Sequence, residues 1–243
     1  MPMMRKPDGT PVMEKVGDYT NPTLLPAAAE KLKALGDVAR TGVVFPDPEN
    51  QCLDWPLPNI LRHMQIQILP EPDQVTIVYL RSNQVRRVRM NGSHPAQIIP
   101  SPYGDSVGRY EGDTLLVDTV GIKVGPLPMI DWYGTPYSEA LHVVERYRLI
   151  DHGAAKDAIE RHERKSVLLP PGETGIEPDL AYAGKGLQIE LTVEDQSVFS
   201  KPWSAVVTYR RAANGWMEDI CAENLRESVG PERKVPAAEA PDF

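Results

Sequence analysis

Several segments after residue 65 alternate between apolar and polar residues with a period of two, which is the pattern of half-buried β-strands. The clearest of them, residues 186–195, places four apolar side chains on one face: Leu187, Ile189, Leu191 and Val193. The other segments with strand character are 65–70, 74–80, 84–90, 108–122 with a strand from Thr114 to Val120, 140–150, 203–211 and 216–224. Turn signals such as Asn91-Gly92 separate most of them, so the pattern predicts about eight antiparallel strands.

The predicted fold is therefore all-β: an antiparallel β-barrel of about eight or more strands. Closing a sheet into a barrel removes its two exposed edges, which otherwise tend to pair with other chains. A two-sheet sandwich is the alternative. We expect residues 61–229 to form the barrel, residues 1–60 an extended N-terminal arm with one helix, and residues 230–243 a flexible tail.

Two helices are expected outside the strands. The first runs from Pro26 to Ala39, because proline suits a first helical turn and the segment is rich in good helix formers. The second opens the segment 153–186, whose first part has a helical pattern and whose second part is rich in proline and glycine. Long insertions between strands are usually functional or disordered. We interpret this segment as a helix-and-loop flap over one mouth of the barrel.

Composition narrows the class of protein further. The 24 prolines and 18 glycines among 243 residues favour short strands in one domain. The net charge of −8 argues against a nucleic-acid partner. No apolar run approaches the ~18 residues of a membrane helix, so no membrane partner is expected. The N-terminus lacks the apolar core of a signal peptide, which predicts a cytoplasmic location, or a periplasmic one if a signal peptide has been removed.

The two cysteines, Cys52 and Cys221, are too few for a disulfide scaffold. They either form one disulfide or stay as buried thiols. Without a signal peptide that would point to an oxidising compartment, the thiols are favoured.

Five short runs together are similar to a family of largely uncharacterised bacterial β-barrel proteins of the calycin or lipocalin-like kind. They are QVRRVRMNGSHP (84–95), GRYEGDTLLVDTVGI (108–122), DWYGTPYSEALHVVERYR (131–148), EDQSVFSKPW (194–203) and EDICAEN (218–224). The family pattern has Trp-Glu-Gly-Asp-Thr where this chain has Tyr110 at the first position, and His-Ser-Glu-Ala-Leu-His-Val where this chain has Tyr137. The resemblance implies a barrel and no particular reaction.

Candidate catalytic residues gather in and after a loop that the pattern places at the rim of the barrel. No Gly-x-Ser-x-Gly, His-Glu-x-x-His, P-loop or dinucleotide-binding signature occurs, and the histidines lack zinc-site spacing, so neither a cofactor nor a metal is predicted. Rim loops display functional groups on rigid scaffolds. The candidates for polarising an oxygen and moving a proton are Asp131, Tyr133, Tyr137, Glu139 and His142.

The candidates for contacts with a substrate are His63, Tyr79, Arg87, Trp132 and Glu145. In an extended strand, Glu145 shares the apolar face of Leu141 and Val143, whereas His142 lies on the opposite face. A carboxylate on that face is either paired, with Arg87 or Arg89 as the expected partner, or desolvated with a raised pKa that suits acid–base catalysis.

Three functional hypotheses follow. The first is a cofactor-independent enzyme, of lyase, dehydratase, isomerase or cyclase type, that transfers protons on a small hydrophobic or aromatic molecule in a barrel cavity. The second is a lipocalin-like protein that binds a small molecule without catalysis. The third is an interaction protein that grips a neighbour, such as another copy of itself, through the proline-rich arm.

Overall fold

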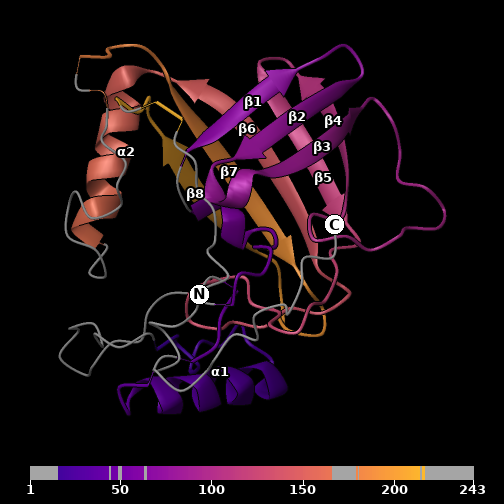
Figure 1. Ribbon diagram of the computed structural model, residues 1–243, viewed down its shortest axis with the longest axis vertical. Helices are drawn as coiled ribbons and strands as arrows, with labels where there is room; N and C mark the ends of the chain where they lie inside the picture. The colour runs from indigo at the N-terminus through magenta and orange to yellow at the C-terminus, as the bar shows by residue number, and fades with distance from the viewer. Residues whose placement is uncertain are drawn as a thin grey trace, which may run out of the picture.

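Eight strands form one curled sheet in the computed structural model, which describes residues 16–43, 45–48, 51–62, 65–165, 179, 181–213 and 215–216 (Figure 1). Neighbours in the sheet follow the chain order: β1 (Ile66–Pro70), β2 (Gln74–Tyr79), β3 (Gln84–Met90), β4 (Asp105–Glu111), β5 (Thr114–Val120), β6 (His142–Ile150), β7 (Gly186–Glu194) and β8 (Trp203–Tyr209). The helices are α1 (Pro26–Ala39), α2 (His152–Lys165) and the short 3-10 turns η1 (Asn59–Arg62) and η2 (Arg81–Asn83).

The sheet is a half-barrel of mixed strand direction, so the predicted closed antiparallel barrel is wrong in both respects. β3 and β4 pair in parallel, with Val88 opposite Ser106. A parallel pair needs the chain to return along the whole strand, which no tight hairpin allows. The segment 91–104 makes that return as a loop, with a hydrogen bond from the Asn91 N–H to the Gly108 carbonyl of β4 and an isolated bridge between Ser101 and Ile122. The sequence shows the turn after β3 but not the direction in which the chain continues.

The other predicted elements agree closely with the structure. Helix α1 has the expected bounds, with Pro26 in its first turn. Seven of the strands fall within predicted segments, and β4 begins three residues before the segment that was expected to hold it. The predicted strand 216–224 lies outside the described residues apart from its first position.

The concave face of the half-barrel is filled by the chain's own N-terminal arm. Three arm side chains and the residue that follows the arm are at most 3% exposed and share one apolar cluster with the inward residues of the sheet: Trp55, Leu57, Ile60 and Leu61. The hydroxyl of Tyr209 on β8 donates a hydrogen bond to the carbonyl of Leu61, which ties η1 to the edge of the sheet. The arm is thus part of the core rather than an appendage, because its apolar residues bury area that an empty half-barrel would expose.

The two helices cover different parts of the sheet. Helix α1 lies at the end where the loop between β5 and β6 runs (Figure 1), and its Leu35 reaches Gly134 of that loop. Helix α2 packs against β7 and β8, with Ala155 fully buried beside Gly186. Most of the loop half of the predicted flap, residues 166–178 and 180, lies outside the described residues. Within the described chain, neither helix is long and apolar enough to cross a membrane.

The state of Cys52 differs from the prediction. Cys52 is disulfide-bonded, so the free thiol favoured by the sequence is wrong for this residue. Cys221 lies outside the described residues.

Candidate functional site

The predicted site residues lie on both sides of the sheet, so they do not form one cluster. Glu145 faces the interior and is fully buried, whereas His142 of the same strand points to the outer face with 31% of its side chain exposed. This is the two-face division that the alternation predicts. Glu139 is exposed, and His63 lies outside the described residues.

The carboxylate of Glu145 forms a buried ion pair with Arg86. Two parallel hydrogen bonds join them, from Nη1 to Oε1 at 3.0 Å and from Nη2 to Oε2 at 2.5 Å. The remaining donors of the guanidinium reach hydroxyl groups on neighbouring strands: Nε to Ser106 at 3.0 Å, Nη2 to Thr119 at 2.6 Å and Nη1 to Tyr79 at 3.4 Å. All five N–H groups of Arg86 therefore have a partner, as a buried guanidinium requires.

This pairing corrects two predictions. The partner of Glu145 is Arg86 rather than Arg87 or Arg89, and Arg87 is exposed on the outer face. The carboxylate of Glu145 is thus paired, which is the first of the two alternatives that the sequence left open. Tyr79, a predicted substrate contact, is fully buried and belongs to the same network.

Two tyrosine hydroxyls complete the interior network. Tyr147 donates to Oε1 of Glu145 at 2.7 Å. Burial raises the pKa of Tyr147 well above its ordinary value and the pKa of Tyr79 to about 12. Both hydroxyls therefore stay protonated inside the core at neutral pH.

Stability is expected to fall in alkaline solution because of these tyrosines. An unfolded tyrosine ionises near pH 10, whereas Tyr79 ionises in the folded protein at about 12, so the stabilisation is complete below pH 10 and is lost as pH rises towards 12. For this group alone, the loss is up to roughly 1.4 kcal/mol per pH unit. Urea unfolding followed across this range would measure it. Tyr79→Phe should lower the slope by up to about 1.4 kcal/mol per pH unit, because the other buried tyrosines still contribute. Tyr110→Phe, at a residue that is 58% exposed, should leave the slope unchanged.

The predicted catalytic residues Asp131 and Tyr137 form hydrogen bonds that hold the loop between β5 and β6 in place. Asp131 is 4% exposed, and its carboxylate accepts hydrogen bonds from the backbone N–H groups of Tyr133 and Thr135 and from the Thr135 hydroxyl. The hydroxyl of Tyr137 donates to the Lys123 carbonyl at 2.8 Å, and burial raises the pKa of Tyr137 to about 12. Each group is engaged locally, so the structure does not bring them together with His142 as the predicted catalytic set.

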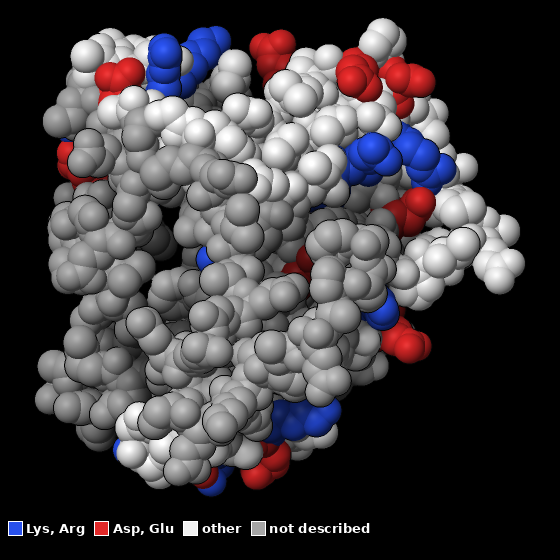
Figure 2. All heavy atoms as spheres, viewed as in Figure 1, with Lys and Arg blue, Asp and Glu red and all other residues white. Residues whose placement is uncertain are grey.

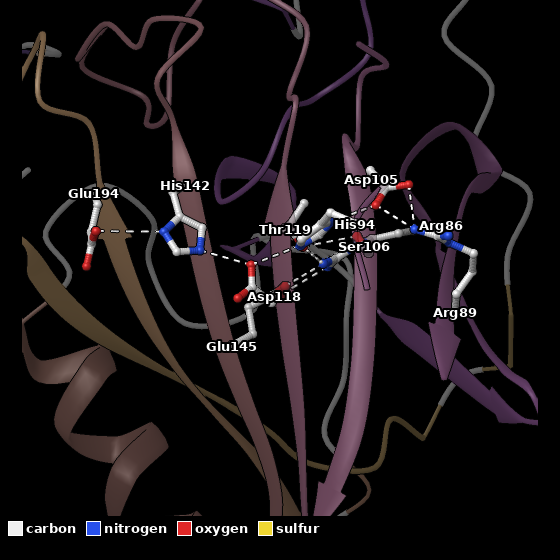
Figure 3. A network of polar contacts seen from close by, with 10 residues as sticks. All are labelled: Arg86, Arg89, His94, Asp105, Ser106, Asp118, Thr119, His142, Glu145 and Glu194. Atoms are coloured by element: carbon white, nitrogen blue, oxygen red, sulfur yellow. Dashed lines mark hydrogen bonds and ion pairs between the residues drawn. The ribbon is translucent and has the colours of Figure 1, made fainter. Parts of the chain in front are cut away.

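A different set of polar side chains forms a continuous row on the outer face, across five neighbouring strands and the 91–104 loop (Figure 3). Its contacts alternate between cationic or imidazole groups and carboxylates. In spatial order the row is Arg89, Asp105, His94, Asp118, His142 and Glu194.

The two imidazoles of the row meet at one carboxylate oxygen. Oδ1 of Asp118 lies 2.9 Å from Nε2 of His142 and 3.2 Å from Nε2 of His94. Nδ1 of His94 lies 2.6 Å from Asp105, so both ring nitrogens of His94 face carboxylates. An ionised carboxylate oxygen can only accept a hydrogen bond. Each of these contacts therefore requires a hydrogen either on the ring nitrogen or on the acid. His94 and Asp105 thereby fix the position of Asp118.

His142 differs from His94 in having one ring nitrogen available. Its Nδ1 lies 3.7 Å from Oε2 of Glu194, which is an ion-pair distance and too long for a hydrogen bond. The imidazole is thus oriented by Asp118 at Nε2, and its Nδ1 lies beside the Glu194 carboxylate without a hydrogen bond to it. An oriented base with a free nitrogen is the arrangement that proton transfer needs.

Apolar residues surround the carboxylate at the centre of the row. Across the sheet, Asp118 pairs with Val107 on one side and Val144 on the other. Along its own strand it lies between Leu116 and Val120, which share its face. On the described part of the face shown in Figure 2, acidic and basic side chains lie next to one another.

Sequence reasoning identified one member of this row as a site residue, His142. His94 lies in the 91–104 loop and Asp118 lies on β5. The local sequence pattern of neither segment indicates that the two side chains are in contact. Asp118 could have been identified from the alternation, because Asp118 and His142 share a face of the sheet once β5 and β6 are taken as neighbours.

In the described part of the chain, no group of three or more His, Cys, Asp and Glu side chains has the geometry to hold a metal ion. Comparisons with family models, with curated proteins and with solved structures found no match to this chain.

Proposed function

We propose that the protein is an enzyme that transfers protons on a small, largely apolar molecule, and that His142 on the outer face is its acid–base group. The observation that carries the proposal is the pairing of His142 with Asp118 through one ring nitrogen while the other nitrogen has no hydrogen-bond partner among the described residues. The proposal keeps the reaction class expected from the sequence and moves the site from the interior to the outer face.

The proposed chemistry uses three groups in sequence. Asp118 accepts the N–H at Nε2 of His142, which leaves the lone pair at Nδ1 to take a proton from the substrate. The charge that develops on the imidazole is balanced by Asp118 on one side and by Glu194 on the other. Val144 and Val120, on the strands that carry the pair, offer apolar contact to the rest of the substrate.

Exchange of carbon-bound hydrogen for deuterium tests this function without a known substrate. The purified protein is incubated in D₂O with a panel of small ketones, enols and aromatic acids, and mass shifts are read by mass spectrometry. We expect the protein to accelerate exchange in at least one compound and His142→Gln to abolish the acceleration, by a factor of about 10²–10⁴.

The matched control is His152→Gln, which removes an imidazole at the start of α2 and should leave exchange intact. Exchange that is no faster than in buffer for every compound, or that survives in His142→Gln, would show that this imidazole is not an acid–base group.

A further inference from the structure

Cys52, in the N-terminal arm, is joined to another sulfur by a disulfide bond. The 243 residues contain one other cysteine, Cys221, which lies outside the described residues. The partner of Cys52 is therefore either Cys221 of the same chain or a second molecule. Contacts of residues that lie close to each cysteine in the sequence distinguish these alternatives.

The arm next to Cys52 is attached to the 3-10 turn η2. The carboxylate of Asp54 accepts a hydrogen bond at 2.8 Å from the side-chain amide of Gln84, which directly follows η2. The ring of Trp55 lies against Arg81, the first residue of η2, with the guanidinium carbon 5.3 Å from the ring centre. Because a single residue separates Cys52 from Asp54, Cys52 lies close to η2 as well.

The chain that follows β8 reaches the same turn. Nε1 of Trp216 donates a hydrogen bond to Oδ1 of Asn83, the last residue of η2, at 3.3 Å. A chain spans at most ~3.6 Å per residue, so the Cα atom of Cys221 lies within about 18 Å of that of Trp216. The Cα atoms of disulfide-bonded cysteines are usually about 5.5–6 Å apart, which these two short stretches of chain allow. The turn η2 thus brings the sequence neighbours of both cysteines together.

We infer that Cys52 is bonded to Cys221 and that this disulfide holds the N-terminal arm in the concave face of the half-barrel. Trp55 and Leu57 follow Cys52 closely and belong to the apolar cluster that fills this face. The bond joins them to the segment after β8 across most of the chain, and cross-links between residues distant in sequence restrict the unfolded chain most. The inference is independent of the proposed function, because neither cysteine belongs to the outer row.

The bond forms by exchange with a low-molecular-weight disulfide such as oxidised glutathione. One cysteine thiolate attacks this disulfide and releases one glutathione thiol, and the second cysteine displaces the other glutathione from the mixed disulfide. The two cysteines are thereby oxidised and glutathione is reduced, with two electrons and two protons transferred. A dithiol such as dithiothreitol reverses the exchange, so the attachment of the arm depends on the redox state of the solution.

Peptide mapping without a reduction step tests the pairing. The protein is equilibrated in a glutathione redox buffer, its free thiols are blocked with iodoacetamide, and it is digested with trypsin. Trypsin releases Cys52 in the peptide 41–62 and Cys221 in the peptide 212–226. We expect these peptides as one cross-linked species that dithiothreitol separates. A peptide 41–62 that is joined to a second copy of itself or to glutathione, or that is blocked by iodoacetamide, would overturn the inference.

Thermal unfolding tests the role of the bond. Cys52→Ser and Cys221→Ser should each lower the Tm of the oxidised protein by about 10 °C or more, because the bond closes a long loop. The double variant should melt at the same temperature as the single variants, since all three lack the same bond. Dithiothreitol should lower the Tm of the wild type to that of the variants and leave the Tm of the variants unchanged.

Hydrogen exchange followed by mass spectrometry locates the effect in the chain. At a temperature below the Tm, reduction should speed exchange in residues 41–62 and leave β7, which the bond does not touch, protected. A wild-type Tm that does not respond to dithiothreitol, or exchange in residues 41–62 that reduction leaves unchanged, would show that the bond does not hold the arm.

Discussion

Replacing Arg86 by methionine, or Glu145 by glutamine, is expected to lower the free energy of unfolding by about 3–5 kcal/mol, because each change leaves the other member of a buried ion pair uncompensated. The side chains are 1% and 0% exposed, so water cannot replace the lost partner. Replacing Arg86 also removes the hydrogen bonds that its guanidinium donates to the hydroxyls of Ser106 and Thr119, which adds to the loss of stability. Urea unfolding of the purified variants would measure the change.

Arg87→Met is the matched control, since Arg87 is the next residue of the same strand and is exposed. Its effect should stay within about 0.5 kcal/mol. The double variant with Arg86→Met and Glu145→Gln should cost less than the sum of the single changes, because it removes both charges together. A cost below about 1 kcal/mol for each single variant would mean that the pair does not hold the strands together.

The strands of this fold follow from local pattern, and their arrangement does not. Alternation places Val143, Glu145 and Tyr147 on one face of β6, and the structure confirms it. The parallel pairing of β3 with β4 depends on the path of the 91–104 loop, which packs through contacts between residues far apart in sequence. The closed barrel was expected because free sheet edges are unfavourable, and the structure instead covers the concave face with the arm.

In the candidate site too, local pattern predicted the face of each side chain but not its partner. Periodicity predicted correctly that His142 and Glu145 lie on opposite faces, but it could not identify which arginine would reach Glu145, because Arg86 and Arg87 face opposite sides of β3. Alternation alone leaves open which of the two faces is inside. In the assembled sheet, Val88 on the Arg86 face is buried. Because Arg86 lies on the same face of β3, the burial of Val88 places Arg86 in the interior as well.

The largest functional effect is expected at the carboxylate that both imidazoles share. Asp118→Asn should lower the rate of enzyme-catalysed deuterium exchange by about 10²–10⁴-fold, because an amide can hold His142 in the wrong tautomer and no longer balances the charge on the ring. Asp118 is a positioning residue in this scheme, so the loss should fall on kcat with little change in KM. Asp113→Asn, an exposed aspartate in the turn before β5, should leave the rate unchanged.

Stability separates this role from a structural one. The members of the pair are 34% and 31% exposed, so water can replace the lost hydrogen bond, and Asp118→Asn should change the free energy of unfolding by no more than about 1 kcal/mol. A rate that is unaffected while the protein is strongly destabilised would mean that Asp118 only ties β5 to β6. A lost rate at preserved stability, together with partial recovery in Asp118→Glu, would show that the carboxylate acts through His142, because glutamate retains the charge but not the distance.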